Sequence, residues 1–318
     1  MNRLSSIRVN DLTKIWGEVK AVDHISFSVD RGEIFGFLGP NGAGKTTTIK
    51  MLVGLTKPTR GSAYVAGYNV MDSIRMVKQR IGVVPERSNL YNELTVTENL
   101  RFVSKLYHVP SEERETRITE LLEIFQLTEY RDRDFAKLSK GLKRRVVIAA
   151  ALIHNPEIIF LDEPTSGLDI MSAKRLREII SDLSEQGVTI FLTTHYIEEA
   201  GVLCDRIALL VKGKIVEIDT PEGLRSIVQD TPILRINYQG KLDQSSLNEI
   251  HGEQVSSIDG ELSILTKNIH ATLESLIIAK QDITIQNIET IKPKLEDAFI
   301  QLTGVSLESM RVEKEGKQ

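Results

Sequence analysis

The chain reads Gly39-Pro40-Asn41-Gly42-Ala43-Gly44-Lys45-Thr46 directly after the apolar run Ile34-Phe35-Gly36-Phe37-Leu38. This order predicts a buried strand, a glycine-rich turn and a helix that opens at Gly44. Such a turn points several backbone N–H groups and the positive end of the helix dipole at one spot, where a phosphate is favoured. The alternative is a plain glycine-rich turn with an exposed lysine, but the strand before it and the helix after it favour a phosphate-binding loop.

Each residue type in the loop suits a phosphate group. Gly39, Gly42 and Gly44 let the backbone approach an anion closely, because they carry no side chain. Lys45 is placed to reach the β- and γ-phosphates of a nucleotide, and the Thr46 hydroxyl is placed to ligate Mg²⁺. The loop therefore predicts a nucleotide site with a magnesium ion.

Two later strands end in residues that suit the same site. The apolar run 158–161 ends in Asp162-Glu163, which is typical of a central parallel strand whose carboxyl end faces a ligand. Asp162 can hold Mg²⁺ through water, and Glu163 can take a proton from an attacking water. His195 closes the strand predicted at 188–192, where it can contact a γ-phosphate, although a lone histidine is usually structural.

Glu86 and Trp16 each have two interpretations. Glu86 follows the strand-like run 81–84, and the residues alone favour a solvated charge there. Trp16 lies in a polar turn between the alternating segments 7–9 and 25–29, which are typical of half-exposed antiparallel strands. Both a buried anchor and a stacking platform for a base stay open for Trp16.

The composition describes an ordinary soluble protein. The 318 residues are 41% hydrophobic and 26% charged with a net charge of -4, whereas a general nucleic-acid binder would be more basic. The length favours a large core with a smaller appendage. Cys204 is the single cysteine, and we expect a buried hydrophobe in a reducing compartment. No apolar run approaches the length that spans a bilayer, so we expect a cytoplasmic chain.

A helical block interrupts the alternation of strands and helices. The periodicity of residues 95–126 is helical, so we expect an inserted helical subdomain at about 90–150. Thr95-Val96-Thr97-Glu98 has the form of a capping box. Ser139 is a natural N-cap, and the helix after it offers a second anion site. The alternative is an ordinary capped helix whose three basic residues, Lys143, Arg144 and Arg145, face solvent.

The sequence changes character near residue 230. We expect a nucleotide-binding domain over 1–230 and a small α+β domain over 231–307, with alternating strands at 233–238, 261–265 and 282–285. Residues 308–318 read as a charged, flexible tail.

In this order, the motifs resemble those of the ATP-binding subunits of ABC transporters. The resemblance covers roughly residues 5–230 and rests on the phosphate loop, Leu138-Ser139-Lys140-Gly141, Asp162-Glu163, Gly167-Leu168-Asp169 and His195. It implies an α/β fold in which a P-loop ABC ATPase core carries an antiparallel β subdomain and an inserted helical subdomain, with the small α+β domain after it. It also implies a head-to-tail dimer of two copies with two ATP molecules sandwiched between them.

The resemblance implies a role for each matching residue. Glu163 matches the general base, His195 the switch histidine and Lys45 the lysine of the phosphate loop, while Asp169 lies at the dimer seam. The implied metal ligands are Thr46, Glu86 and Asp162. The implied ATP contacts are Trp16, Gly39, Pro40, Asn41, Gly42, Ala43, Gly44, Lys45, Thr46 and Thr47 of one subunit, with Ser139 and Gly141 of the other.

Three residues depart from the family pattern. Glu86 stands where the family usually has a glutamine, and Lys140 and Leu142 replace the usual second glycine and glutamine of the signature loop.

Residues 295–299 resemble the final helix of ATPases related to drug, sodium, lipid and polysaccharide exporters of the ABC-2 type. The resemblance therefore implies an ATPase that powers export by a separate integral membrane permease, at the inner face of the cell membrane.

Two rival functions explain less of the sequence. A soluble ABC ATPase that acts as a mechanical switch on ribosomes or DNA usually has two such domains or a long coiled-coil insertion, and the mild acidity disfavours a nucleic-acid partner. An unrelated P-loop kinase accounts neither for the helix start at Ser139 nor for His195.

Overall fold

A computed structural model describes residues 5–228, 233–240, 250–252, 254–258, 261–278, 283–291 and 294–305. The chain divides into a larger unit that runs to Pro221 and a smaller unit that spans Glu222–Gly304. Among the residues described, no helix has the length and apolar character needed to cross a bilayer. The change of character at 230 and the tail 308–318 lie outside the described residues.

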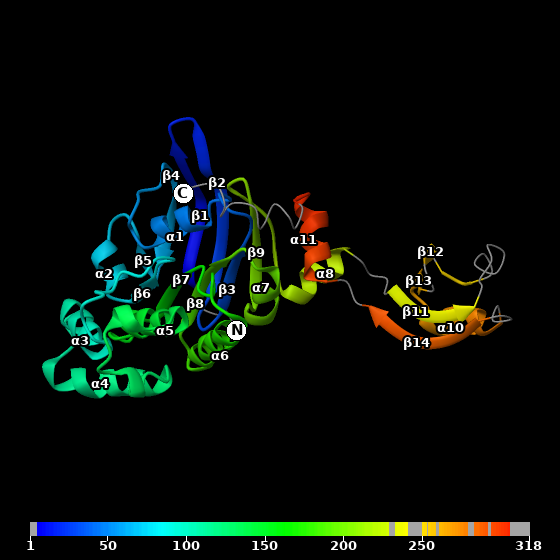
Figure 1. Cartoon of the computed structure of the whole chain (residues 1–318). Helices are drawn as coiled ribbons and strands as arrows, with labels where there is room; N and C mark the ends of the chain where they lie inside the picture. The colour runs from blue at the N-terminus through cyan, green and yellow to red at the C-terminus, as the bar shows by residue number, and fades with distance from the viewer. Residues whose placement is uncertain are drawn as a thin grey trace. The chain divides into compact units, whose positions relative to one another are not determined.

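A six-stranded sheet organises the larger unit (Figure 1). Its strands are β3 (Ile34–Leu38), β6 (Ile81–Val84), β7 (Ile158–Asp162), β8 (Thr189–Thr194), β9 (Arg206–Val211) and β10 (Lys214–Asp219), in the spatial order β10-β9-β3-β8-β7-β6. All run parallel except β10, which forms an antiparallel hairpin with β9. The predicted apolar runs are its buried inner strands, because a parallel sheet is covered on both faces.

The carboxyl ends of these parallel strands meet at one edge of the sheet. The register pairs Leu38 with Thr194, and Asp162 with Thr193. The loops after β3, β7 and β8 therefore begin side by side, and the loop after β6 begins beside β7. Ligands of open α/β sheets bind outside such an edge.

An antiparallel sheet forms the second layer of the larger unit. It contains β1 (Ser5–Trp16), β2 (Val19–Asp30), β4 (Arg60–Val65) and β5 (Tyr68–Asn69) in the order β2-β1-β4-β5. Ile7 and Val9 are buried while Arg8 between them is exposed, so the predicted alternation is confirmed. This sheet is the antiparallel β subdomain that the resemblance implies.

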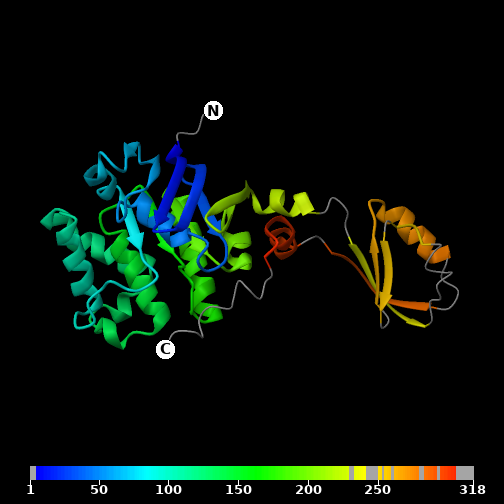
Figure 2. The same ribbon diagram turned by 90° about the horizontal axis from the view of Figure 1, so that it is seen from above.

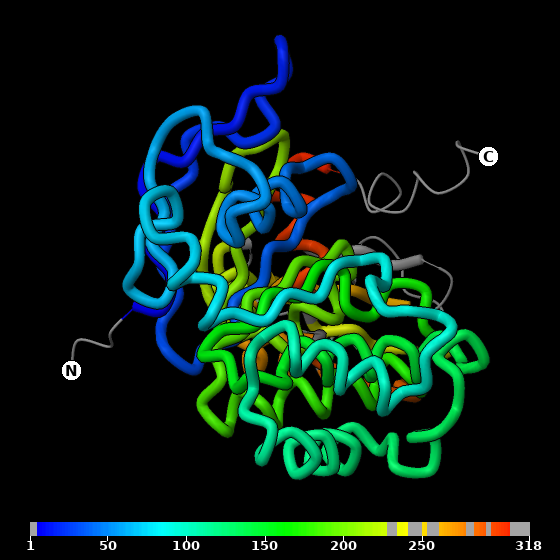
Figure 3. The backbone as a smooth tube through the Cα atoms, turned by 90° about the vertical axis from the view of Figure 1, so that its left-hand side faces the viewer, coloured from blue at the N-terminus to red at the C-terminus, as the bar shows by residue number. Residues whose placement is uncertain are grey.

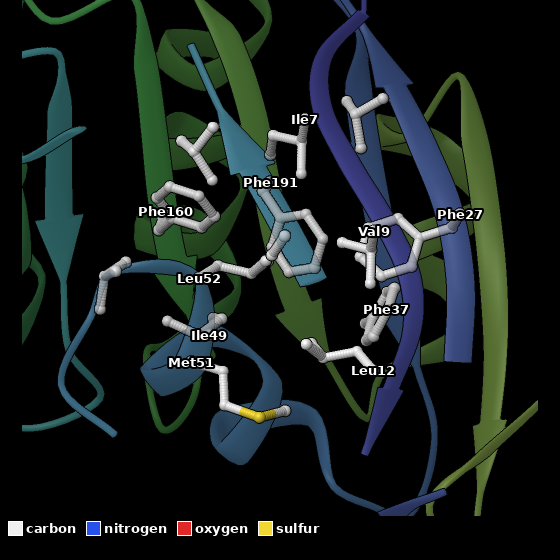
Figure 4. Close-up of a cluster of buried hydrophobic side chains, with 14 of the residues drawn as sticks. Ile7, Val9, Leu12, Phe27, Phe37, Ile49, Met51, Leu52, Phe160 and Phe191 are labelled. Atoms are coloured by element: carbon white, nitrogen blue, oxygen red, sulfur yellow. The ribbon is translucent and has the colours of Figure 1, made fainter. Parts of the chain in front are cut away.

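The main core lies between the two sheets and around α1 (Lys45–Leu52). Figure 4 shows side chains of β1, of α1 and of the six-stranded sheet pointing toward one another. The ring of Phe37 lies 5.0 Å from that of Phe27 and 4.9 Å from that of Phe191, measured between centroids. Close packing of these rings holds β3 against β8, which gives the phosphate loop after β3 a rigid base.

The segment between β6 and β7 contains α3 (Val96–Leu106), α4 (Ser111–Ile124) and α5 (Lys140–Ala151), and it gathers at the end of the larger unit away from β1 and β2 (Figures 1 and 3). The predicted capping box is confirmed, because Thr95 accepts a hydrogen bond from the Glu98 N–H and donates its own N–H to the Glu98 carboxylate. The predicted N-cap is also confirmed, since the Ser139 hydroxyl accepts from the Leu142 N–H. The other α-helices described in this unit are α2 (Ile74–Lys78), α6 (Ile170–Glu185) and α7 (Ile197–Leu203), and two 3-10 helices, Thr128–Tyr130 and Phe135–Lys137, lie between α4 and α5.

The smaller unit is built on a four-stranded sheet. Its strands are β11 (Ile233–Gly240), β12 (Gln254–Ile258), β13 (Glu261–Leu265) and β14 (Ile283–Ile291), in the order β12-β13-β11-β14. α10 (Ile269–Ile278) covers one face of the sheet (Figure 2) and buries Leu276 in the same cluster as Leu234 and Ile264. α8 (Pro221–Val228) and α11 (Leu295–Thr303) precede and follow the sheet in sequence. The sequence did not predict β12.

Candidate active site

The phosphate loop lies between β3 and α1, where close packing admits only glycine at two positions. A Cβ on Gly39 would lie 2.1 Å from the Leu210 carbonyl oxygen, and a Cβ on Gly44 would lie 2.4 Å from the Ala21 carbonyl oxygen. Gly44 also adopts a left-handed conformation, with φ 106°. The loop backbone is therefore seated against β9 and β2, and no side chain of these two residues stands between it and a ligand.

The N-terminus of α1 is suited to an anion. Gly44 is the N-cap and has no side chain that could accept from the first N–H groups of the helix. The first turn carries no acidic residue. The first N–H groups of a helix have no acceptor within the helix, and the helix dipole is positive at this end. The phosphate loop and the N-terminus of α1 therefore fit a phosphate group.

Lys45 begins α1 and reaches back across the loop. Its Nζ donates to the carbonyl oxygens of Gly39 at 2.6 Å and Pro40 at 3.1 Å, and it lies 3.3 Å from Oε1 of Glu163. Burial lowers the pKa of Lys45, although the charge of Glu163 opposes this change. The side chain thus holds a buried ammonium beside both the loop and a carboxylate.

Thr46 and Asp162 place two oxygen atoms side by side. The hydroxyl of Thr46 donates to Oδ1 of Asp162 at 3.1 Å, and the hydroxyl of Thr193 donates to the same oxygen at 2.6 Å. Burial raises the pKa of Asp162, and the two hydrogen bonds oppose this rise. Glu86 lines the same pocket as Thr46. Hydroxyl and carboxylate oxygens are ligands that suit Mg²⁺, so this set fits the ion.

Glu163 follows β7 with its backbone in the left-handed region, at φ 49°, which is uncommon for a residue with a side chain. Its N–H donates to the Thr193 carbonyl oxygen at 3.1 Å. Its Oε2 accepts from Nδ1 of His195 at 2.8 Å, while Oε1 faces Lys45. Burial alone would raise the pKa of Glu163, but the His195 hydrogen bond and the charge of Lys45 together outweigh burial, so the pKa is lowered. The carboxylate is therefore ionised at neutral pH and able to accept a proton.

One pocket brings most of the predicted residues together. It is lined by Ala21, Asn41, Gly42, Ala43, Gly44, Lys45, Thr46, Thr47, Glu86, Glu163, Ser166 and His195. Gly39 and Pro40 lie next to the lining, because their carbonyl oxygens hold Lys45. Asp162 is joined to the lining through Thr46.

Trp16 is not among the described residues that line this pocket. Its side chain at the end of β1 is 54% exposed, so the interpretation as a buried anchor is wrong, while the stacking platform stays a prediction. Nζ of Lys14 lies 4.1 Å from the centroid of the indole ring, so a cation already covers part of the aromatic surface.

Ser139 and Gly141 also lie outside the described lining of the pocket. They begin α5, where Ser139 is exposed and a Cβ on Gly141 would lie 2.6 Å from Oγ of Ser172. The Ser172 hydroxyl donates to Oδ2 of Asp169 at 2.7 Å, and Asp169 caps α6. The start of α5 is thus packed closely against the start of α6.

Sequence reasoning missed two residues that hold the site. Thr193 bonds Asp162, and its place at the end of a strand beside β7 was a usable signal. The alternative interpretation of α5, an ordinary capped helix, placed Arg144 toward solvent, and for this residue that interpretation is wrong. Its side chain is only 8% exposed, and its Nη2 donates to the Asp162 carbonyl oxygen at 2.7 Å.

Residues 22–166 match the family model described as ABC transporter. The chain is 35% identical over 308 residues to the linearmycin resistance ATP-binding protein LnrL of Bacillus subtilis, covering 95% of this chain and 99% of that one. It is 34% identical over 310 residues to the daunorubicin resistance ATP-binding protein DrrA2 of Streptomyces coeruleorubidus, covering 94% of this chain and 95% of that one.

The solved structures agree with these relatives. An ATP-binding subunit of an ABC transporter superposes with a TM-score of 0.64 and 33% identity, over 70% of this chain and 93% of that one. A dimeric ATP-binding cassette in a post-hydrolysis state with ADP and Pi superposes with a TM-score of 0.62 and 29% identity, over 67% and 98%. The fold and the activity implied by the motifs are confirmed: the chain belongs to the ABC transporter family, as an ATP-binding subunit that hydrolyses ATP.

Proposed function

We propose that two copies of this chain pair head to tail, bind two ATP molecules between them and drive a separate integral membrane permease. The observation that supports this pairing is that the predicted site residues lie in two separate places on one chain. Lys45 and Glu163 line one pocket, whereas Ser139 lies outside it at the exposed start of α5. A second copy completes the pocket when its own Ser139 and Gly141 face the phosphates, and the dimeric cassette with ADP and Pi supports this arrangement.

Within one copy, the phosphate loop binds the nucleotide. Gly39, Pro40, Asn41, Gly42, Ala43, Gly44, Lys45, Thr46 and Thr47 form this loop and the first turn of α1. Backbone N–H groups and the ammonium of Lys45 contact the phosphates, and Trp16 stacks on the adenine. Thr46, Glu86 and Asp162 would hold Mg²⁺, which would supply positive charge beside the phosphate oxygens.

Glu163 and His195 supply the proton chemistry. Glu163 accepts a proton from the water that attacks the γ-phosphate, and its lowered pKa keeps the carboxylate ready for this step. His195 holds the carboxylate through a 2.8 Å hydrogen bond and contacts the γ-phosphate. Most of the rate enhancement comes from positioning and charge neutralisation, as is general for phosphoryl transfer.

The start of α6 forms the seam between the two copies. Asp169 caps this helix and is exposed there, and the next two side chains, Ile170 and Met171, are 83% and 72% exposed. Adjacent exposed apolar side chains are favoured at a protein interface, where a second copy removes them from water.

Export is the direction that the relatives support, because LnrL and DrrA2 are named for resistance to linearmycin and daunorubicin. The chain is then cytoplasmic and lies at the inner face of the cell membrane through its permease. The net charge of -4 argues against a nucleic-acid partner, because the phosphate backbone of a nucleic acid attracts positively charged proteins. Residues 1–230 form the ATP-binding domain, with the helical insertion at about 90–150, and residues 231–307 form an accessory domain before the tail 308–318.

The pairing is tested by mixing two inactive variants, Glu163→Gln and Ser139→Arg. In a dimer of either variant alone, both ATP sites contain the substituted residue and are inactive. A mixed dimer concentrates both defects in one site and leaves the other site intact, so equal mixing restores up to about a quarter of the wild-type ATPase rate. The control mixes Glu163→Gln with Lys45→Ala, whose defects lie in the same half of the site and leave no intact site.

Recovery in the first mixture and not in the control supports the shared site. If neither mixture recovers activity and the wild-type chain hydrolyses ATP while it sediments as a monomer, each chain works alone and the paired site is excluded. Co-purification with a membrane protein in detergent then tests the permease.

A further inference from the structure

Arg144 gathers the main chain of two separate loops around one side chain. Its Nε donates to the Pro164 carbonyl oxygen at 2.9 Å, and its Nη2 donates to that of Asp162 at 2.7 Å. Its Nη1 donates to the carbonyl oxygens of Pro85 at 2.5 Å and of Glu86 at 3.4 Å. The guanidinium therefore joins the end of β7 to the segment that follows β6.

The two loops that Arg144 joins carry different parts of the proposed chemistry. The β7 loop presents Asp162 and Glu163, whereas the β6 loop presents Glu86. A guanidinium is planar and offers five N–H donors in fixed directions, so its contacts fix the two loops relative to each other. Lysine offers one rotating ammonium group and lacks this geometry.

Burial of the charged Arg144 side chain is unfavourable unless neighbouring groups stabilise the charge. The side chain is 8% exposed, and burial lowers its pKa to about 10, which leaves it protonated at neutral pH. Asp162 and Glu86 are the two carboxylates whose charges most oppose this lowering. A buried guanidinium with carbonyl acceptors and carboxylates around it is a satisfied group.

The next residue on the same helix shows that the arrangement is specific to Arg144. Nη1 of Arg145 donates to the Phe125 carbonyl oxygen at 3.1 Å, just past the end of α4. Arg145 therefore contacts the helical segment, while Arg144 contacts the catalytic loops. Two neighbouring arginines thus provide a matched pair for experiment.

We propose that Arg144 is a positioning residue for ATP hydrolysis. It fixes the loop after β6, which carries Glu86, relative to Asp162 and Glu163 at the end of β7. The proposal rests on the roles proposed above for these three residues. Arg144 also belongs to α5, the helix that begins at Ser139.

The test compares Arg144→Ala, Arg144→Lys and Arg145→Ala in steady-state ATPase assays of the full chain, with a magnesium titration and the binding of a fluorescent ATP analogue. Arg144→Ala is expected to lower kcat by about 10- to 100-fold with little change in affinity for the analogue, because small displacements of reacting groups cost this much. The Mg²⁺ concentration for half-maximal rate is expected to rise by about 10-fold, since outer partners of metal ligands affect metal affinity to this degree. Arg144→Lys is expected to fall between wild type and Arg144→Ala in both quantities, and Arg145→Ala is expected to keep the wild-type magnesium dependence.

Equal changes in kcat and magnesium dependence for Arg144→Ala and Arg145→Ala would overturn the proposal, because both would then report a general weakening of α5. If Arg144→Ala fails to fold, Arg144→Lys decides, and wild-type kcat with wild-type magnesium dependence in that variant rejects the need for the planar fork. Glu163→Gln in the same assay separates the two levels. An inactive Glu163→Gln beside a fully active Arg144→Ala rejects only the role of Arg144, whereas a fully active Glu163→Gln rejects the proposed site.

Discussion

Nδ1 of His195 lies 2.8 Å from Oε2 of Glu163, so the residue after β8 holds the carboxylate after β7. Lys45 faces the other carboxylate oxygen at 3.3 Å. Burial is the largest single influence on the pKa of Glu163 and raises it, yet the two partners together lower the pKa by favouring the ionised form. The site therefore contains a base whose charge and orientation are set before any substrate arrives.

Glu163→Gln removes this base while keeping the size of the side chain. We expect kcat for ATP hydrolysis to fall by about 10²- to 10⁴-fold, the range that general-base catalysis usually contributes. Affinity for ATP should stay near the wild-type value, because the phosphate loop is unchanged. Steady-state ATPase assays and equilibrium binding of a fluorescent ATP analogue measure the two quantities. A wild-type kcat in this variant would remove Glu163 from the mechanism.

Gly39 and Gly42 lie in the same loop but predict different costs for alanine. A Cβ on Gly39 would meet the Leu210 carbonyl oxygen at 2.1 Å, whereas a Cβ on Gly42 has no heavy atom within 4 Å and meets only the strain of φ +77°. We expect Gly39→Ala to lower the free energy of unfolding by more than about 2 kcal/mol, and Gly42→Ala by about 1 kcal/mol. Thermal melting of both variants measures the difference. Equal melting temperatures would show that the loop relaxes away from β9.

Trp16→Ala tests the stacking platform. Stacking of a base on an aromatic ring contributes about 1–3 kcal/mol, so we expect KM for ATP to rise by about 5- to 150-fold with kcat nearly unchanged. Trp16→Phe should recover part of the loss, and GTP should be affected like ATP because every base presents a π face. Lys14→Ala is the control for the cation above the ring. An unchanged KM in Trp16→Ala would leave the tryptophan as an ordinary exposed side chain.

His154 predicts an acid-sensitive stability for the larger unit. Its Nε2 donates to the Ile81 carbonyl oxygen at 3.0 Å, its ring stacks on Tyr107 at 3.8 Å between centroids, and burial lowers its pKa to about 4. The unfolded chain, with a histidine pKa near 6.5, binds more protons between these two values, so the free energy of unfolding falls as pH drops from about 6.5 to about 4. The fall reaches at most about 3 kcal/mol.

His154→Gln should remove this part of the pH dependence, because glutamine keeps an N–H donor for Ile81 but does not titrate. Urea unfolding at several pH values, followed by circular dichroism, measures it. His270→Gln is the matched control, since the His270 side chain is 84% exposed. If His154→Gln and wild type lose stability in parallel between pH 6.5 and 4, the histidine is not the group responsible.

Local patterns in the sequence were enough for the elements that present the site. Apolar runs ending in Leu38 and Asp162 predicted buried parallel strands, and the glycine spacing predicted the turn after β3. The N-cap at Ser139 was also readable, because the hydroxyl contacts an N–H only three residues away. Information of this kind lies within one element and needs no knowledge of the neighbouring strands.

Contacts that depend on several elements were beyond the sequence. A basic side chain on a helix is usually exposed, and only the assembled ends of β6 and β7 supply the carbonyl oxygens that bury Arg144. The left-handed backbone of Glu163 likewise occurs together with a hydrogen bond to Thr193 of the adjacent strand, which the sequence does not reveal. Exposure of Trp16 could not be decided either, since a tryptophan suits a core and a binding surface equally well.

The 3.3 Å contact between Lys45 and Glu163 joins the lysine of the phosphate loop to the carboxylate that we propose as the general base. The ammonium that waits for a phosphate is one of the charges that keep the proton affinity of the carboxylate low. In the proposed mechanism a phosphate binds beside Lys45 and its negative charge offsets that of the ammonium, so we expect the pKa of Glu163 to rise. We therefore expect nucleotide binding and the proton affinity of Glu163 to be coupled through the single charge of Lys45.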